Sequence, residues 1–280
     1  MVRLTTMAMF CAERGASNFE GSNHANPVMD RKQGENTAMS TPGLLGVLGG
    51  MGPLATIDFM HKVLDATEAQ RDQDHIPVVT ACIPQIPDRT AAFRGEGDSP
   101  LAAMIESGRR LVEAGACLIV VPCNTAHLWF EPLQAALGVP MLHLVDAALD
   151  DAAALAGNDG RIGLLATDGT IASGLYVNRR PASGQPMQWL LPTAREMVEW
   201  VMPGIAAVKA GEIAQGAEFL SQAAAALGKR GAQAVILGCT EIPVVLNGSN
   251  APLPVVDASA ALARRCVAWS QAERASATHA

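Results

Sequence analysis

The sequence of 280 residues is poor in aromatic side chains, which make up 4% of it, although 49% of the residues are hydrophobic. A core built from Ala, Val, Leu and Gly suits helices packed closely on a sheet. Basic residues are also few, 20 against 27 acidic ones, so the net charge is −7. An acidic chain without a basic stripe is not expected to bind nucleic acid or an anionic membrane surface. No apolar run reaches the roughly 18 residues that a membrane-spanning helix needs.

The six cysteines form no C-x-x-C pair and no His/Cys cluster with zinc spacing, so we expect no metal site. Several lie in runs that look buried. Free buried thiols are typical of a reducing compartment, which predicts a cytoplasmic protein. Cys82, Cys117 and Cys266 are not followed by polar residues, so we assign them to the core, and we interpret Cys11 as a tail thiol.

Residues 1–41 are expected to form a mobile N-terminal extension. From residue 12 onward this segment is rich in Gly, Asn, Ser, Glu and Lys and has little to bury. The apolar stretch near its start is too short and too polar for a signal sequence. An alternative is that the effective chain begins at Met39. In both cases, folded sequence is expected from Gly43.

Short apolar runs alternate with helical stretches along the rest of the chain, a pattern typical of an α/β fold with mostly parallel sheets. Ser99 is placed to cap a helix that begins at Pro100. A helical region with breaks near Pro203 and Gly211 is expected over residues 194–229. The expected strands cover residues 44–48, 76–82, 117–123, 161–167 and 234–239, and the other helices residues 54–69, 100–113 and 258–273.

Two landmarks repeat at nearly the same offset. Gly46 and Gly163 are 117 positions apart, and Cys123 and Cys239 are 116 apart. This spacing indicates an internal duplication. We therefore predict two similar lobes, each a mostly parallel sheet flanked by helices, related by a pseudo-twofold axis with the active site in the cleft. The first lobe would comprise residues 42–142 and 257–275, and the second residues 143–256.

Cys123 and Cys239 each end an apolar run and are followed by polar residues. The carboxyl ends of strands are where open α/β sheets bind ligands. Two thiols there could face one carbon from opposite sides, removing a proton from one face and returning it to the other. A thiol with a reference pKa near 8.5 is only a few per cent thiolate at neutral pH. The start of a helix after each cysteine would favour the thiolate, and His127 and Glu241 could orient the thiols or relay protons.

Four motifs, at residues 48–56, 84–90, 122–127 and 238–241, resemble the aspartate/glutamate racemase superfamily, most closely its aspartate racemase branch. The resemblance covers about residues 43–275 and implies a cofactor-independent amino-acid racemase, commonly a dimer. Glutamate racemases usually have His where this chain has Glu241, and family members usually lack the extension. The resemblance places the catalytic thiols on Cys123 and Cys239, and substrate-binding residues on Met51, Arg89, Asn124, Thr125, Lys209 and Thr240.

Arg89 and Lys209 predict an acidic amino acid as substrate, aspartate first and possibly glutamate, because a cation binds a carboxylate strongly in a closed site. We expect a homodimer with no nucleic-acid or membrane partner. Two other functions remain open at this point. One is a maleate cis–trans isomerase-like enzyme that uses one cysteine as nucleophile. The other is a non-catalytic two-lobed protein that closes on an amino acid.

Overall fold

The computed structural model describes residues 41–156 and 160–278. The extension predicted over residues 1–41, including Cys11, therefore lies outside the described residues, apart from Thr41. The strands are β1 (Leu45–Gly49), β2 (Val78–Cys82), β3 (Leu118–Val120), β4 (Arg161–Ala166), β5 (Gln188–Leu190), β6 (Ala234–Gly238) and β7 (Val255–Asp257).

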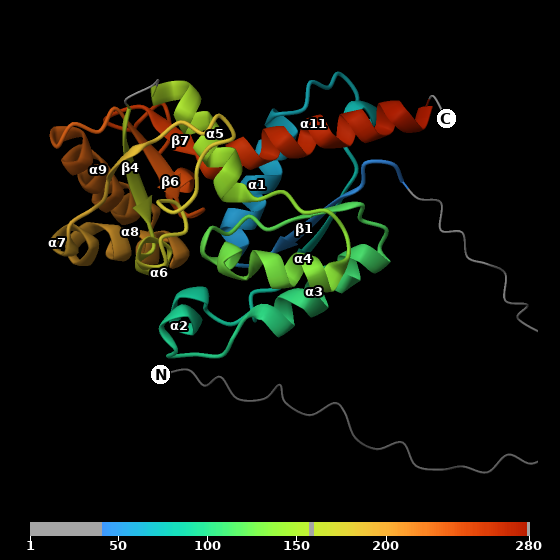
Figure 1. The fold of residues 1–280 in the computed structure, drawn as a ribbon, viewed down its shortest axis with the longest axis horizontal. Coiled ribbons are helices and arrows are strands. Elements are labelled where there is room, and N and C mark those ends of the chain that lie inside the picture. The colour runs from blue at the N-terminus through green and yellow to red at the C-terminus, as the bar shows by residue number, and fades with distance from the viewer. Residues whose placement is uncertain (1–40, 157–159, 279–280) are drawn as a thin grey trace, which may run out of the picture. The chain divides into compact units, whose positions relative to one another are not determined.

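Helices cover and connect these strands (Figure 1). The α-helices of the first half are α1 (Pro53–Asp65), α2 (Arg89–Arg94), α3 (Leu101–Glu113), α4 (Phe130–Leu137) and α5 (Leu144–Ala156). Those of the second half are α6 (Asp168–Ala172), α7 (Ala194–Glu196), α8 (Met202–Lys209), α9 (Ile213–Lys229), α10 (Ile242–Val245) and α11 (Ala258–Thr278). Short turns of other pitch are the 3₁₀ turns η1 (Asp72–Asp74) and η2 (Thr125–Trp129) and the π-helical turn η3 (Met197–Val201).

The strands of the described chain form two parallel sheets with the same plan. One has the order β2-β1-β3, and the other β5-β4-β6-β7. In each, the first strand of the lobe lies between the next two strands along the chain. The prediction of an α/β fold with two similar lobes, made from the repeated spacing, is thereby confirmed. The short strands β5 and β7 were not expected from the sequence.

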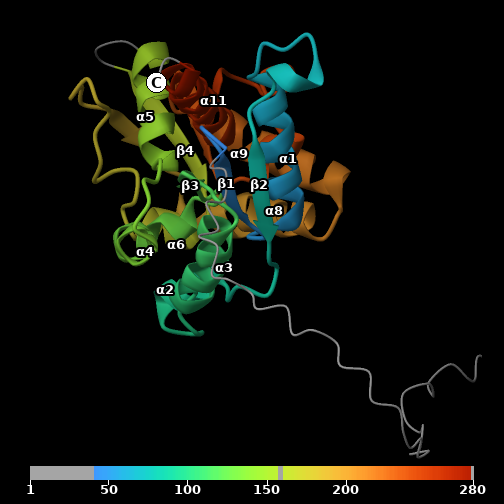
Figure 2. The same cartoon turned by 90° about the vertical axis from the view of Figure 1, so that its right-hand side faces the viewer.

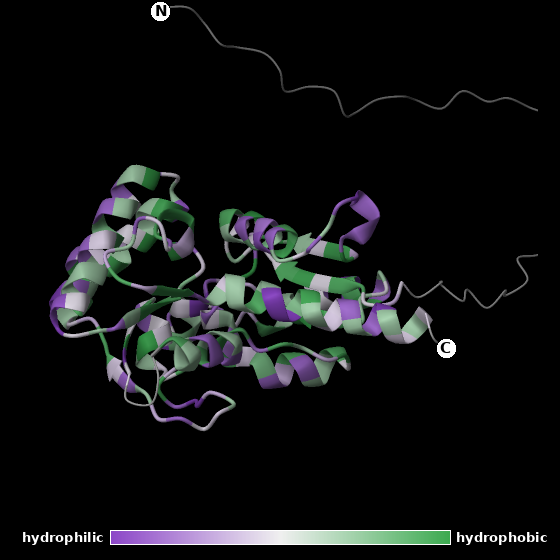
Figure 3. Ribbon diagram, turned by 90° about the horizontal axis from the view of Figure 1, so that it is seen from above, coloured by the Kyte–Doolittle hydropathy of each residue, from purple (hydrophilic) through white to green (hydrophobic). Residues whose placement is uncertain are grey.

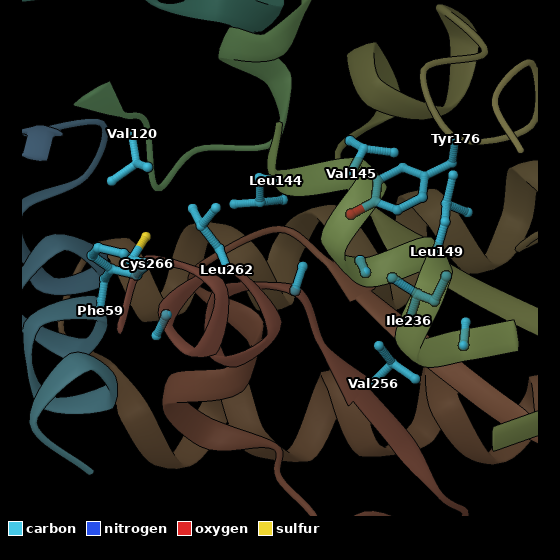
Figure 4. Close-up of a cluster of buried hydrophobic side chains, with 14 of the residues drawn as sticks. Phe59, Val120, Leu144, Val145, Leu149, Tyr176, Ile236, Val256, Leu262 and Cys266 are labelled. Carbon is cyan, nitrogen blue, oxygen red and sulfur yellow. The ribbon is translucent and has the colours of Figure 1, made fainter. Parts of the chain in front are cut away.

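Side chains alternate between the two faces of each sheet, as the pleat requires. Leu45 and Val47 of β1 point into a core cluster that also contains Ile236 of β6, so one central core serves both sheets. Figure 4 shows part of this central core, with side chains from α1, α5, β6, β7 and α11. Leu48 of β1 and Leu237 of β6 instead face outer clusters, the first with α3 and α4 and the second with α8 and α9.

The final helix α11 packs against both α1 and α5. Figure 2 shows α1 alongside β1 and β2, with α11 next to it. Both α5 and α11 contribute to the core that the two sheets share. The lobe boundaries at residues 142/143 and 256/257 therefore stay a prediction. Figure 3 shows hydrophobic strands flanked by helices of mixed hydropathy, as expected for amphipathic helices on buried sheets. Among the described residues, no helix has both the length and the apolar character needed to span a bilayer.

Some local predictions are wrong. Cys82 is exposed, because it ends the edge strand β2 instead of an interior strand, and Cys117 is only half-buried; Cys266 is buried as expected. The helix expected from Pro100 begins at Leu101, although the Leu101 N–H does donate to Ser99 Oγ at 3.4 Å. No break occurs at Pro203, which lies in the first turn of α8 just after the π-helical turn.

Candidate active site

A narrow cavity of about 20 Å³, room for about one water molecule, lies where β1, β3, β4 and β6 end. This is the edge of parallel sheets at which ligands bind. Of the residues predicted for the site, all except His127 line it. The full lining consists of Met51, Asp88, Arg89, Thr90, Cys123, Asn124, Thr125, Thr167, Lys209, Cys239, Thr240 and Glu241.

The two cysteines line this one cavity although they come from different lobes. Cys123 follows β3 and is 6% exposed, and Cys239 follows β6 directly and is 5% exposed. The helices after them are shorter than expected: a 3₁₀ turn follows Cys123, and the four-residue α10 follows Cys239. Short helices have weak dipoles, so neighbouring side chains must contribute more to the thiol electrostatics than helix ends do.

Glu241 is the nearest ionisable partner of Cys239. The Cys239 Sγ–H donates to Glu241 Oε2 at 2.9 Å, while Glu241 Oε1 is buried with no hydrogen-bond partner among the described residues. A Cβ at Gly52 would lie 3.2 Å from Oε1, so this glycine leaves room for the carboxylate. Burial, followed by the negative charge of Glu241, raises the pKa of Cys239 well above its usual range. Cys239 is therefore a neutral thiol in this arrangement.

Arg89 lines the cavity, and backbone carbonyls hold its guanidinium in place. Its Nη1 donates to the carbonyls of Ile86 (3.1 Å) and Pro87 (2.9 Å), and its Nη2 to that of Met51 (3.4 Å). Its Nε has no partner among the described residues. Of the five N–H donors of a guanidinium, Nε–H and one N–H of Nη2 are left over, and they can donate to a ligand carboxylate.

Lys209 ends α8 and is exposed as a residue, so it stands where the cavity meets solvent. Burial of its amine opposes the charged form, but nearby negative charge, that of Glu241 above all, outweighs it and raises the pKa of Lys209. Within the described part of the chain, neither Lys209 nor Arg89 has a carboxylate within 4 Å. Two cations without ion pairs make the cavity suited to an anionic ligand.

Three threonine hydroxyls join the lobes beside the cavity. Thr125 Oγ1 lies 3.0 Å from Thr167 Oγ1 and 2.8 Å from Thr170 Oγ1, and the last two are 3.0 Å apart. Thr167 also caps α6 by accepting from the Thr170 N–H. Thr167 was missed from the sequence, yet the offset of 117 that relates Gly46 to Gly163 also relates the GGMG turn at Gly50 to Thr167.

Asp88 and Thr90, on either side of Arg89, are the other lining residues that sequence reasoning missed. Asp88 caps α2 by accepting from the N–H groups of Thr90 and Ala91, and so fixes the turn that carries Arg89. Burial opposes ionisation of Asp88, but these hydrogen bonds and the charges of Arg89 and Lys209 lower its pKa. The sequence feature that could have identified both residues is their place in the motif at residues 84–90, which also contains Arg89.

His127 lies outside the cavity lining, and its environment gives it no free nitrogen for a proton relay. Its Nδ1–H donates to the Cys123 carbonyl at 2.8 Å, and its Nε2 accepts from the Leu144 N–H at 3.1 Å. Burial lowers the pKa of His127 to about 4, so the ring is neutral. Its contact with the site is therefore through the backbone of Cys123. It ties the end of the β3 segment to the start of α5.

The lobes also contact each other beside Thr90 and Thr167, which line the cavity. Arg94 at the end of α2 pairs with Asp168 at the start of α6. A Cβ at Gly169 would lie 3.1 Å from Thr90 Oγ1, so α2 and α6 pack closely there.

In the described residues, no three His, Cys, Asp or Glu side chains come together in a way that could hold a metal ion.

Comparisons with known proteins agree with this geometry. Residues 48–266 match the family described as Asp/Glu/Hydantoin racemase. The broad specificity amino-acid racemase RacX of Bacillus subtilis is 30% identical over 234 residues, which are 80% of this chain and 96% of that protein. The structure of Picrophilus torridus aspartate racemase aligns with a TM-score of 0.71 and 28% identity, over 81% of this chain and 94% of that one. A putative Asp/Glu racemase structure from Yersinia pestis aligns with a TM-score of 0.64 and 25% identity, over 81% and 99%.

Proposed function

The chain belongs to the Asp/Glu/hydantoin racemase family and is an amino-acid racemase of this cofactor-independent kind, and from that premise we propose that it racemises acidic amino acids, aspartate first. The observation that carries this proposal is the cavity itself. It combines two cysteines from different lobes with two cations that have no ion pair among the described residues.

The proposed reaction uses Cys123 and Cys239 as two bases. One cysteine, as thiolate, removes the α-proton of the substrate, and the other, as thiol, donates a proton to the opposite face. The hydrogen bond from Cys239 to Glu241 supports a starting state in which Cys239 is the donor. After turnover, the protonation states of the two thiols are exchanged. The reverse reaction then uses the same groups in the opposite roles.

The α-hydrogen of an amino acid is very weakly acidic, so the developing negative charge must be stabilised. We propose that donors from Asn124, Thr125 and Thr240 bind the α-carboxylate, into which this charge spreads. The burial of both thiols strengthens these interactions, because a water-poor site has a low dielectric constant. Arg89 and Lys209 would then bind the side-chain carboxylate that distinguishes aspartate from neutral amino acids.

Proton NMR in D₂O tests the reaction. We expect the purified protein to exchange the α-hydrogen of L- and D-aspartate for deuterium and to interconvert the two. Cys123→Ala and Cys239→Ala should each lose racemisation, and Cys266→Ala, a buried thiol outside the cavity, serves as the matched control. Wild-type racemisation rates in either active-site variant would refute the two-thiol proposal.

Substrate choice needs a separate measurement, since the relative from Bacillus subtilis is named a broad specificity racemase. Aspartate, glutamate, asparagine and alanine should be compared by kcat/KM under one set of conditions. A preference for aspartate over asparagine supports the role proposed for the two cations, and equal values contradict it. The homodimer and the cytoplasmic location stay predictions, the first of which size-exclusion chromatography with light scattering would check.

A further inference from the structure

Tyr176 is the one tyrosine of the chain, and it is fully buried at 0% exposure in the segment between α6 and β5. Its ring packs edge-on against Trp189, with 6.3 Å between ring centroids. Figure 4 shows it beside Val145 and Leu149 of α5. Its hydroxyl reaches Asn124 Oδ1 at 2.5 Å, across 52 positions of sequence. A side chain that lines no part of the cavity is therefore bonded to one that does.

The segment that carries Tyr176 is held on both sides. Gly174 has a φ of 69°, a left-handed conformation that favours glycine in this turn. Three residues after Tyr176, Arg179 binds Asp146 of α5 with two hydrogen bonds, from Nε at 2.7 Å and from Nη2 at 2.9 Å. The position of the tyrosine ring is thus determined by backbone geometry and by a bidentate ion pair.

The hydrogen bond determines which end of the Asn124 amide faces the ligand. Among the described residues, the Tyr176 hydroxyl has no other hydrogen-bond partner, so its proton is donated to Asn124 Oδ1. Burial above all, with the negative charge of Asp257 adding to it, raises the pKa of Tyr176 well above its usual range, which keeps this proton in place. The amide nitrogen Nδ2 is left buried, without a partner in the described chain, on a residue that lines the cavity.

We infer that Tyr176 is a positioning residue, whose hydroxyl holds the Asn124 amide with its NH₂ group, instead of its carbonyl oxygen, toward the ligand carboxylate. The inference rests on the proposed function, since it takes the ligand to be an amino acid. A flipped amide would place its oxygen lone pairs against the carboxylate and remove a donor from the place where negative charge develops. The buried NH₂ group also needs an acceptor, which a bound carboxylate supplies.

A double-mutant cycle on kcat/KM for aspartate tests this role. Tyr176→Phe keeps the ring and removes only the hydroxyl, so we expect a roughly ten- to hundredfold loss, as for one hydrogen bond to a charged group. Its KM should rise, because a misplaced Asn124 amide binds the ligand carboxylate less well. A purely structural defect would instead lower the active fraction and leave KM unchanged. Adding Tyr176→Phe to Asn124→Ala should cost less than about threefold more. Trp189→Phe, which changes the packing of the same ring, is the control and should leave KM unchanged.

Two results would overturn the inference: a Tyr176→Phe KM within about threefold of wild type, or losses that multiply fully in the double variant. A second readout does not depend on turnover. Labelling the single tyrosine with ¹³C at Cζ gives one NMR signal, which should not titrate up to pH 10 and should shift in Asn124→Ala. If the wild type racemises no amino acid, the proposed function fails, whereas this signal still decides whether Tyr176 holds Asn124. An unchanged signal in Asn124→Ala would overturn the inference alone.

Discussion

Replacing Glu241 by Gln should make the Cys239 thiolate easier to form. In the native site, the thiol donates to the Glu241 carboxylate across 2.9 Å, and both groups are almost fully buried. Losing the thiol proton would place two negative charges side by side. The glutamine amide removes one of these charges and can donate a hydrogen bond to the sulfur. The pKa of Cys239 should therefore fall in this variant.

The size of the effect follows from the distance between the groups. Two unit charges about 4 Å apart repel by about 4 kcal/mol at an effective dielectric constant of 20. Even half of that energy changes the ratio of thiolate to thiol more than tenfold, because about 1.4 kcal/mol corresponds to a factor of ten. Lys209, which attracts the thiolate, remains in both proteins, so its contribution cancels in the comparison.

The assay is alkylation by iodoacetamide over a range of pH, with each cysteine quantified by peptide mass spectrometry. Because thiolate is the reactive form, Cys239 in Glu241→Gln should be alkylated at least tenfold faster than in the wild type near neutral pH. Glu212→Gln, an exposed glutamate outside the cavity lining, is the matched control and should behave as wild type. An unchanged rate at Cys239 would mean that Glu241 does not hold the proton on this thiol.

Other predictions concern carboxylate binding by Arg89, a glycine turn and stability in acid. Arg89→Ala should cost about 2–5 kcal/mol of binding free energy, so kcat/KM for aspartate should fall about 30-fold or more. Arg89→Lys should recover only part of this loss, because lysine cannot bind a carboxylate bidentately. Wild-type kinetics in Arg89→Ala would refute the role. In urea unfolding, Gly50→Ala should lower the free energy of unfolding by roughly 3 kcal/mol or more, since φ is 93° and the Cβ would lie 2.4 Å from the Ile83 backbone. Gly95→Ala, with φ of 74° and open space around the Cβ, should lower it by only about 1 kcal/mol. Equal losses in the two variants would contradict this reasoning. The pKa of His127 is about 4 in the fold against 6.5 for the free side chain, so the unfolded chain takes up a proton first as the pH falls. Stability present above pH 6.5 should fall by roughly 3 kcal/mol down to pH 4, and His127→Gln should flatten this slope in denaturation curves.

Much of the fold could be predicted because its signals are local and occur twice. The apolar runs that end in Cys123 and Cys239 are both followed by polar residues, and one offset relates them. Parallel sheets then bring the strand ends to one edge, which explains why the predicted lining residues meet in one cavity. The exposure of Cys82 could not be predicted in this way. A strand with the same composition is buried in the middle of a sheet and exposed at its edge, and the strand order β2-β1-β3 is decided by tertiary packing.

Contacts that span the chain were also out of reach. The bond of Tyr176 to Asn124 depends on a turn at Gly174 and on an ion pair with α5, none of which leaves a periodic pattern in the sequence. His127 shows the opposite case. Its place four residues after Cys123 suggested that it orients a thiol or relays protons, but the start of α5 occupies its second nitrogen. Spacing alone cannot tell a catalytic imidazole from one that satisfies backbone groups.

The duplicated lobes differ at the position that matters most for a two-thiol reaction. Two residues after Cys123 stands Thr125, whose hydroxyl is hydrogen-bonded to other threonines. Two residues after Cys239 stands Glu241, whose carboxylate accepts a hydrogen bond from the Cys239 thiol. The proposed two-thiol reaction needs the thiols in opposite protonation states, and unequal neighbours would provide that difference before substrate binds. Enantiomers have equal free energies, so kcat/KM must be the same in both directions whatever the asymmetry. The unequal neighbours should instead appear in KM and kcat separately: the enantiomer that meets the prepared protonation state should saturate the enzyme at lower concentration. Equal KM values for D- and L-aspartate in the wild type, unchanged in Glu241→Gln, would contradict this view of the site.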